Sequence, residues 1–364
     1  MEKLVVNKVF WKNKNVLITG HTGFKGSWLS LWLQEMGANV IGVSLEPPTN
    51  PSVYEQARVA ENMQSLRADV RDLDNIKKIF KEFKPEIVFH LAAQPLVRYS
   101  YREPVETYQT NVMGTLNILE AIRSIDSVRS AVMITTDKCY ENREWEWGYR
   151  ENEPMGGHDP YSSSKGCAEL LIASYRDSYF PAAGYIKHKT AIASVRAGNV
   201  IGGGDWAEDR LVPDIIRSVL SKNLVHIRNP NSIRPWQHVL EPLDGYLVLA
   251  EKLFVSGAKY AEAWNFGPKE EDAKSVKWIV GKMTKLWADD ASWVVDDGDH
   301  PHEASYLKLD CSKAHLKLGW WPKWSLECAL KKIVEWHKEE RKGSNMRLFS
   351  LNQIESYMQT REEK

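Results

Sequence analysis

Short apolar, β-rich runs alternate with helical stretches along the first half of the chain. The expected strands cover 15–19, 39–44, 63–70, 86–93, 130–136 and 190–200, and the expected helices cover 27–37, 73–83, 104–125 and 161–180. Strands separated by helices imply right-handed βαβ units. We therefore predict an α/β fold with a Rossmann-type doubly wound parallel sheet.

The alternation weakens after residue 202, where Trp, Pro and charged residues become denser. We expect a large domain formed by 1–197 together with about 237–267. A smaller, irregular C-terminal domain would be formed by 198–236 and 268–364 and would bind the substrate. The chain shows no repeats and no low-complexity linker.

Composition favours a soluble globular protein, with 43% hydrophobic and 26% charged residues. Lys+Arg and Asp+Glu both number 48, so no bulk charge attracts nucleic acid or an anionic membrane, and neither is expected as a partner. The four cysteines have no CxxC and no metal-ligand spacing, which favours reduced thiols and no metal site. No apolar run approaches the roughly 20 residues that span a bilayer, and no signal-peptide core is present, so we predict a cytoplasmic location.

Three glycines of the stretch "GHTGFKG" follow the first predicted strand and open a helix. Gly20, Gly23 and Gly26 have the residue type that permits a tight turn and a close approach of backbone N–H groups to a pyrophosphate. An ordinary structural turn is the alternative, but the position after the first strand is the one that a dinucleotide site requires. Ser44 stands where an acidic ribose ligand is expected, and no Arg in 39–50 could receive a 2′-phosphate. The sequence therefore favours NAD over NADP.

Further motifs resemble a known family. The GxxGxxG turn, "ADVRD" (68–72), "HLAAQ" (90–94), a Thr that ends the fifth strand and "YSSSK" (161–165) resemble the extended short-chain dehydrogenase/reductases, the NAD-dependent epimerase/dehydratase family, that act on nucleotide sugars. The triplet "TDK", "RAGNVIGGGDW" and "IRPWQHVLEPLDGY" are most similar to the family's 4,6-dehydratases of CDP-glucose. Relatives acting on dTDP-glucose carry Glu at the position of Lys138.

The resemblance implies a set of functional residues. Cofactor contacts would come from Gly20, Gly23, Phe24, Gly26, Asp69, Val70, Leu91, Ala92, Ala93, Tyr161 and Lys165. The catalytic set would be Thr136, Asp137, Lys138, Tyr161 and Lys165. The nucleotide sugar would contact Asn199, Arg210, Arg234 and His302, with Trp206 in the same loops. The resemblance also implies a homodimer that forms through the helices around 104–125 and 161–180.

The Tyr161–Lys165 pair fits the oxidation of a sugar hydroxyl. Its i,i+4 spacing in a predicted helix puts both side chains on one face, whereas a second YxxxK, Tyr185–Lys189, lies between elements. Free tyrosine has a pKa of about 10. Cationic Lys165 and the oxidised nicotinamide should lower that pKa, so that Tyr161 can take the proton of the C4 hydroxyl while Thr136 relays or orients it.

The adjacent Asp137 and Lys138 fit an elimination. The C4 ketone acidifies the hydrogen on C5, water leaves across C5–C6, and the hydride returns to C6, which leaves NAD unchanged. Asp137 would protonate the departing hydroxyl, and Lys138 would be the base if its amine were neutral. A charged Lys138 would instead depress the pKa of Asp137, so polarisation of the 4-keto oxygen or action through water stay open for this lysine, as does a surface role.

Three competing functions remain. A nucleotide-sugar 4-epimerase would reduce the ketone again without losing water, and Asp137 is the residue that argues against it. A 4,6-dehydratase of another nucleotide-glucose would share every motif above. A non-catalytic dinucleotide sensor would not need the Tyr161–Lys165 pair.

Overall fold

The computed structural model describes residues 6–289, 291–296 and 307–360. Its centre is a seven-stranded parallel sheet in the order β11-β6-β5-β4-β1-β2-β3. The strands are β1 Asn15–Thr19, β2 Asn39–Ser44, β3 Gln64–Arg67, β4 Ile87–His90, β5 Ser130–Ile134, β6 Ala191–Arg196 and β11 Ala263–Asn265. This sheet confirms the predicted α/β fold, although the third, fourth, fifth and sixth strands are shorter than expected.

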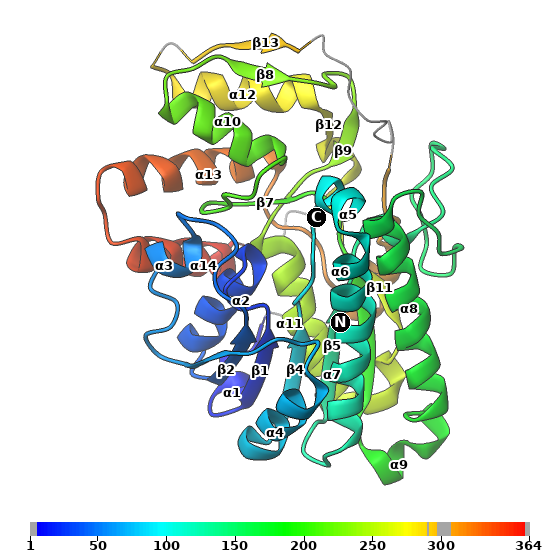
Figure 1. Cartoon of the computed structure of the whole chain (residues 1–364). Coiled ribbons are helices and arrows are strands. Elements are labelled where there is room, and N and C mark those ends of the chain that lie inside the picture. The colour runs from blue at the N-terminus through cyan, green and yellow to red at the C-terminus, as the bar shows by residue number, and fades with distance from the viewer. Residues whose placement is uncertain (1–5, 290, 297–306, 361–364) are drawn as a thin grey trace.

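Helices cover both faces of the sheet (Figure 1). The longer ones around it are α2 Phe24–Glu35, α4 Leu73–Phe83, α7 Gly114–Arg123, α8 Pro160–Ser178 and α11 Leu240–Ser256, and the shorter ones in the first 190 residues are α1 Lys8–Trp11, α3 Val53–Gln56, α5 Val97–Arg102, α6 Pro104–Tyr108 and α9 Tyr185–His188. Alternate residues of β1 enter different cores, with Val16 and Ile18 on the α2–α11 side and Leu17 on the α4–α7 side. Burial of both faces explains why the strands read as continuous apolar runs.

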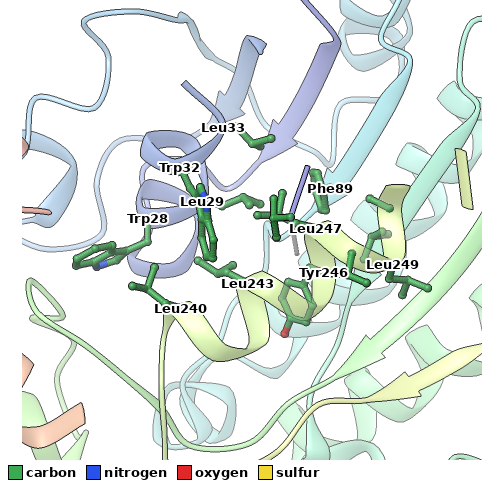
Figure 2. Close-up of a cluster of buried hydrophobic side chains, with 14 of the residues drawn as sticks. Trp28, Leu29, Trp32, Leu33, Phe89, Leu240, Leu243, Tyr246, Leu247 and Leu249 are labelled. Atoms are coloured by element: carbon green, nitrogen blue, oxygen red, sulfur yellow. The ribbon is translucent and has the colours of Figure 1, made fainter. Parts of the chain in front are cut away.

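The α2–α11 face holds a dense aromatic core. Figure 2 shows Trp28 and Trp32 of α2 beside Leu243 and Tyr246 of α11, with Phe89 of β4 on the same side. Trp28, Trp32 and Tyr246 are fully buried. The helix that follows the glycine turn is therefore fixed to the sheet by large apolar side chains, which bury roughly 150–250 Å² each.

The predicted helix over 104–125 is interrupted. It consists of α6, a π-helical turn over Gln109–Met113 and α7. The turn brings Asn111 inward, where its Oδ1 accepts from Gln94 N at 2.8 Å and its Nδ2 donates to Ser164 Oγ at 2.9 Å. A π-helical turn often marks a functional position, and this one joins the loop after β4 to α8.

The C-terminal part is less regular. Most of it lies beyond the carboxyl end of the sheet, whereas its last helix, Met346–Gln359, packs against α2 (Figure 1). It contains the short strands β7 Val200–Ile201, β8 Val225–Ile227, β9 Ile233–Pro235, β10 Gln237–His238, β12 Ala273–Ser275 and β13 Trp293–Val295, and the helices α10 Leu211–Leu220, α12 Val276–Trp287, α13 Leu326–Arg341 and α14 Met346–Gln359. A separate apolar core unites α10, α12 and α13. Among the described residues, no helix is long and apolar enough to cross a bilayer.

Candidate active site

The glycine turn leaves no room for side chains at two of its three glycines. A Cβ on Gly26 would stand 2.1 Å from Gly20 O, and a Cβ on Gly20 would stand 2.8 Å from Ala92 N. Gly20 also has a φ of 76°, which other residues rarely adopt. Gly23 is the N-cap of α2 and makes no side-chain cap, so main-chain N–H groups remain available to an anion at the helix start. The turn fits a dinucleotide pyrophosphate.

The other predicted cofactor residues lie at the same edge of the sheet. Asp69 and Val70 follow β3, and Leu91, Ala92 and Ala93 follow β4, where Ala92 N donates to Thr19 Oγ1 at 3.1 Å. The carboxylate of Asp69 is held by Arg71 at 2.6 Å. Partial burial raises the pKa of Asp69, but the hydrogen bonds from Arg71 outweigh this effect and keep that pKa below its usual value. Phe24 packs against the position of Gly202, where a Cβ would be 2.8 Å from its ring.

The end of β2 carries Ser44 at the position where an acidic ribose ligand was expected. Ser44 Oγ forms a 2.7 Å hydrogen bond with Thr22 Oγ1 of the glycine turn. Glu46 is turned toward Arg67, whose Nε lies 2.8 Å from its Oε1. A buried hydroxyl pair, rather than a carboxylate, therefore borders the turn at this strand.

The proposed oxidation residues meet at the end of β5. The side chain of Thr136 hydrogen-bonds the Tyr161 phenol, and Thr136 Oγ1 also contacts Asp137 Oδ1 at 3.0 Å. Tyr161 and Lys165 share one face of α8, and Lys165 Nζ lies 3.4 Å from Ile134 O. Thr136, Asp137, Tyr161 and Lys165 are all buried. The structure therefore brings four of the five predicted catalytic residues into one enclosed cluster.

Without a bound ligand, burial is the main influence on the pKa values of Tyr161 and Lys165 in this cluster. It raises the pKa of Tyr161 to about 12, against the hydrogen bond from Thr136 and the positive charge of Arg210. Burial also lowers the pKa of Lys165 to about 8, although the charge of Glu169 acts in the opposite direction. The lowered tyrosine pKa expected from the sequence therefore requires the additional cation of an oxidised nicotinamide.

Lys138 differs from its neighbours. Its backbone N donates to Thr136 Oγ1 at 3.4 Å, and its side chain is half-buried. Asp137 is enclosed more tightly, because a Cβ on Gly198 would stand 2.0 Å from its Oδ2. A second amine near this carboxylate is Lys25, which the sequence motifs did not indicate. Burial and the charges of Arg210 and Lys165 lower the pKa of Lys25 to about 7, while Asp137 opposes them.

The predicted substrate residues are dispersed over the loops beyond β6. Asn199 has a φ of 32°, and its carbonyl accepts from Gln237 N at 3.3 Å. Arg210 stands at the N-cap position of α10, donates to Asp205 at 3.2 Å and acts electrostatically on Tyr161. Arg234 lies buried on β9, with Nη1 3.0 Å from Ile233 O. His302 lies outside the described residues.

The ring of Trp206 is packed among other side chains. It is 8% exposed, its Nε1 donates to Gln56 Oε1 at 3.0 Å, and its ring packs edge-on against His337 at 5.0 Å. The second YxxxK is also structural. Tyr185 packs on Gly257, and Lys189 lies two residues before the start of β6, at the amino end of the sheet and away from the Tyr161 cluster.

A buried ionic network lies next to the cluster. The sequence motifs did not indicate this network. Glu169, one helical turn beyond Lys165, accepts from Ser194 Oγ and from Arg196 Nη2, each at 2.7 Å. Arg196 Nη1 lies 2.6 Å from the hydroxyl of Tyr140, in the turn that carries Asp137. Despite full burial, Arg196 keeps the pKa of Glu169 below its usual value. The i,i+4 step from Lys165 is the signal that could have identified Glu169.

The fold and site together define a dinucleotide-binding enzyme of the short-chain dehydrogenase/reductase class. A family model described as GDP-mannose 4,6 dehydratase matches residues 17–333, and the chain belongs to that family. This confirms the resemblance identified in the sequence.

Individual relatives agree with this assignment. The chain is 59% identical over 354 residues to CDP-glucose 4,6-dehydratase of Salmonella typhimurium strain LT2, an alignment that covers 97% of this chain and 99% of that enzyme. UDP-glucose 4-epimerase of Thermotoga maritima, solved with UDP-glucose, superposes with a TM-score of 0.76 at 25% identity, covering 90% of this chain and 99% of that one. A dTDP-glucose 4,6-dehydratase of Bacillus anthracis, solved with NAD, shares the fold with a TM-score of 0.72 at 19% identity, covering 92% and 99%.

Proposed function

We propose that the chain is an NAD-dependent hydro-lyase that converts CDP-glucose into CDP-4-keto-6-deoxyglucose. The observation that carries this proposal is 59% identity to the Salmonella CDP-glucose 4,6-dehydratase along 97% of the chain. The buried cluster of Thr136, Asp137, Tyr161 and Lys165 supports it, because it contains the groups for oxidation and a carboxyl group for elimination. Asp137 favours dehydration over 4-epimerisation.

In the first half of the proposed reaction, Tyr161 removes the proton of the C4 hydroxyl while Thr136 orients that hydroxyl. Lys165, one turn along α8, favours the phenolate by its charge. NAD, which the glycine turn and Lys165 would hold, supplies the hydride acceptor and later the hydride donor. The enclosed position of the cluster excludes water and strengthens these electrostatic effects.

In the second half, Asp137 protonates the departing C6 hydroxyl and an amine removes the hydrogen on C5. Asp137 is 3% exposed, and its Oδ1 accepts from Thr136 Oγ1 at 3.0 Å, so its carboxyl group lies beside the oxidation residues. Lys138, in the same turn, is our proposed base, and Lys25 is the second amine within electrostatic reach of Asp137.

The substrate is tested by incubating the protein with NAD and, in separate reactions, the CDP-, dTDP-, UDP- and GDP-glucoses, followed by mass measurement. We expect CDP-glucose to lose the mass of one water. Conversion of dTDP-glucose but not of CDP-glucose would refute the choice of nucleotide. An unchanged mass with inversion at C4 would instead identify a 4-epimerase.

The base is tested with Lys138→Ala. We expect this variant to oxidise C4, seen as NADH formation in a single turnover, but to stall before elimination. Deuterium from solvent would then fail to enter C5. Wild-type turnover in Lys138→Ala combined with a stall in Lys25→Met would transfer the role to Lys25.

We also propose that two copies of the chain pair through the helices around 104–125 and 161–180, which are α6, α7 and α8. This surface carries exposed apolar side chains, namely Val105 (67% exposed), Met113 (48%), Leu170 (62%) and Tyr179 (50%). A concentration of large apolar groups on neighbouring helices is typical of a protein interface.

A further inference from the structure

The carboxylate of Asp209 is shared by two arginines from different parts of the chain. Arg98 Nη1 of α5 lies 3.4 Å from Asp209 Oδ1, and Arg228 Nη2, directly after β8, lies 3.6 Å from the same atom. The side chains are 24–38% exposed, and both distances exceed those of strong charge-assisted hydrogen bonds. This ion pair is therefore accessible to solvent and loosely held, so another anion can compete for the arginines.

The ion pair spans the proposed active site. Arg98 precedes Ser100 by two residues, and Ser100 Oγ accepts from the backbone N of Tyr161 at 3.1 Å. On the other side, Asp209 precedes Arg210, whose charge acts on the Tyr161 phenol. Figure 1 shows α5 at the end of the sheet that faces β9 and the C-terminal part. The Arg98–Asp209 contact therefore joins α5, whose Ser100 contacts the start of α8, to the loop before α10.

Two guanidinium groups around one oxygen anion form the arrangement that also binds phosphates. A diphosphate carries more negative charge and more acceptor oxygens than a carboxylate, so it is the stronger ligand for the same arginines. Arg228 is in addition 3.9 Å from Asp214 Oδ2, so it would keep a carboxylate partner if Asp209 moved away. Arg98 has Asp209 as its ion-pair partner within the described residues.

We propose that Arg98 is a substrate-binding residue, and that Asp209 occupies the place which the diphosphate of the nucleotide sugar takes on binding. This inference rests on the proposed function, because it requires a substrate that carries a diphosphate. Asp209 thus competes with the substrate for Arg98, and the contact between α5 and the loop before α10 is exchanged for a contact through the ligand.

The competition predicts effects of opposite sign for the two members of one ion pair. Arg98→Gln removes a phosphate ligand and should weaken the binding of CDP about tenfold, the effect of one charged hydrogen bond. Asp209→Asn removes the competing anion and should strengthen CDP binding several-fold. Asn also tolerates the left-handed backbone of this position, where φ is 56°. A merely structural ion pair would give two variants that change in the same direction.

The test is calorimetric titration of CDP, and of cytidine as the phosphate-free probe, into the protein saturated with NAD. Arg102→Gln in the same helix is the charge-matched control and should bind CDP as the wild type does. Cytidine binding should be the same in all variants. Arg98→Lys, which keeps the charge but loses the guanidinium fork, should lie between wild type and Arg98→Gln, and thermal unfolding checks that each variant is folded.

Opposite shifts for Arg98→Gln and Asp209→Asn, seen with CDP and not with cytidine, support the inference. Equal losses or unchanged CDP affinity in both variants overturn it while leaving the proposed function intact. A wild-type protein that dehydrates CDP-glucose but binds CDP and cytidine equally well also overturns it. Failure of the wild type to bind CDP or to convert CDP-glucose would refute the proposed function, and this inference with it.

Discussion

Tyr161 depends on its neighbours for reactivity. Its phenol is buried against Thr136, and its pKa of about 12 keeps it protonated in the chain by itself. Lys165, with a pKa lowered to about 8, is close to the point at which it loses its charge. Below that pH Lys165 is charged, and its charge together with that of an oxidised nicotinamide is expected to convert the phenol into the base.

Replacing Tyr161 by Phe should therefore lower kcat about 10²- to 10⁴-fold, the usual contribution of a general base. The fold should be unaffected, since the ring and its packing are kept. The measurement is turnover of CDP-glucose together with thermal unfolding. Tyr185→Phe, in the other YxxxK, is the matched control and should retain full activity. Full activity in Tyr161→Phe would instead favour a dinucleotide-binding protein without this chemistry.

The proposed reacting groups could be recognised from short motifs because the residues of each motif lie in one helix or at the end of one strand. Tyr161 and Lys165 share a helix face, and Thr136 ends a strand, so both positions can be recognised from the sequence. Lys25 and Glu169 were missed because their importance comes from distant residues that fold against them. The Arg98–Asp209 contact has the same origin, since 111 positions separate its members.

At the scale of elements, the alternation of apolar runs predicted the sheet, since buried parallel strands have that signature. The π-helical turn at Gln109–Met113 was not predicted. Its Asn111 is held by Gln94 and Ser164, which belong to other elements. Helical periodicity contains no information about such contacts, so a continuous helix was expected there.

The glycine turn makes a prediction at this scale. Gly26→Ala places a Cβ 2.1 Å from Gly20 O, and the main chain cannot yield without opening the turn. We expect a loss of about 1–3 kcal/mol in the free energy of unfolding, as for other overpacked sites, and the loss of NAD binding. Urea unfolding and titration with NAD measure the two effects.

Gly281→Ala is the control for that experiment. Gly281 lies inside α12, and a Cβ added there would have no heavy atom of the described residues outside its own helical backbone within 4 Å. Alanine is favoured over glycine in a helix by about 0.5–1 kcal/mol, so this variant should be slightly more stable and should bind NAD normally. A destabilised Gly281→Ala would show that the loss in Gly26→Ala is not specific to the turn.

At the scale of the whole molecule, buried histidines control the response to acid. Burial is the main cause that lowers the pKa of His21 to about 4 and the pKa values of His90, His238 and His337 to about 3. These groups are neutral when folded but take up protons near pH 6.5 when unfolded. Because the unfolded chain binds these protons first, the free energy of unfolding is highest above the ordinary histidine pKa of about 6.5. It decreases as the pH falls from there toward 4.

We expect the free energy of unfolding to fall by as much as about 5 kcal/mol per pH unit in that window, since four protons are involved. Glu241, whose pKa burial raises to about 7, offsets one of them because its folded form binds a proton first. His337→Leu should reduce the slope by one proton. Urea unfolding at several pH values measures how steeply the free energy of unfolding depends on pH. His226→Gln, at an exposed histidine, is the control. An unchanged pH dependence in His337→Leu would contradict the role of the buried histidines.

The proposed dimer is tested by placing a charge in the apolar surface. Leu170→Glu on α8 should convert the dimer into a monomer, because a buried unpaired carboxylate costs several kcal/mol. Sedimentation velocity reports the mass, and Leu316→Glu, at a residue 78% exposed outside that surface, should leave it unchanged. A monomeric wild type, or a dimer that tolerates Leu170→Glu, would contradict the pairing.

Among the described residues, the turn after β5 is hydrogen-bonded through the main chain of Lys138, whose backbone N donates to Thr136 Oγ1, while the lysine side chain is half-buried. A different side chain at this position would therefore leave Thr136 and Asp137 in place. In evolution, a single codon could exchange an amine for a carboxylate without disturbing the oxidation step. The fold thus separates the groups of the oxidation step from one neighbouring position at which the side chain can change.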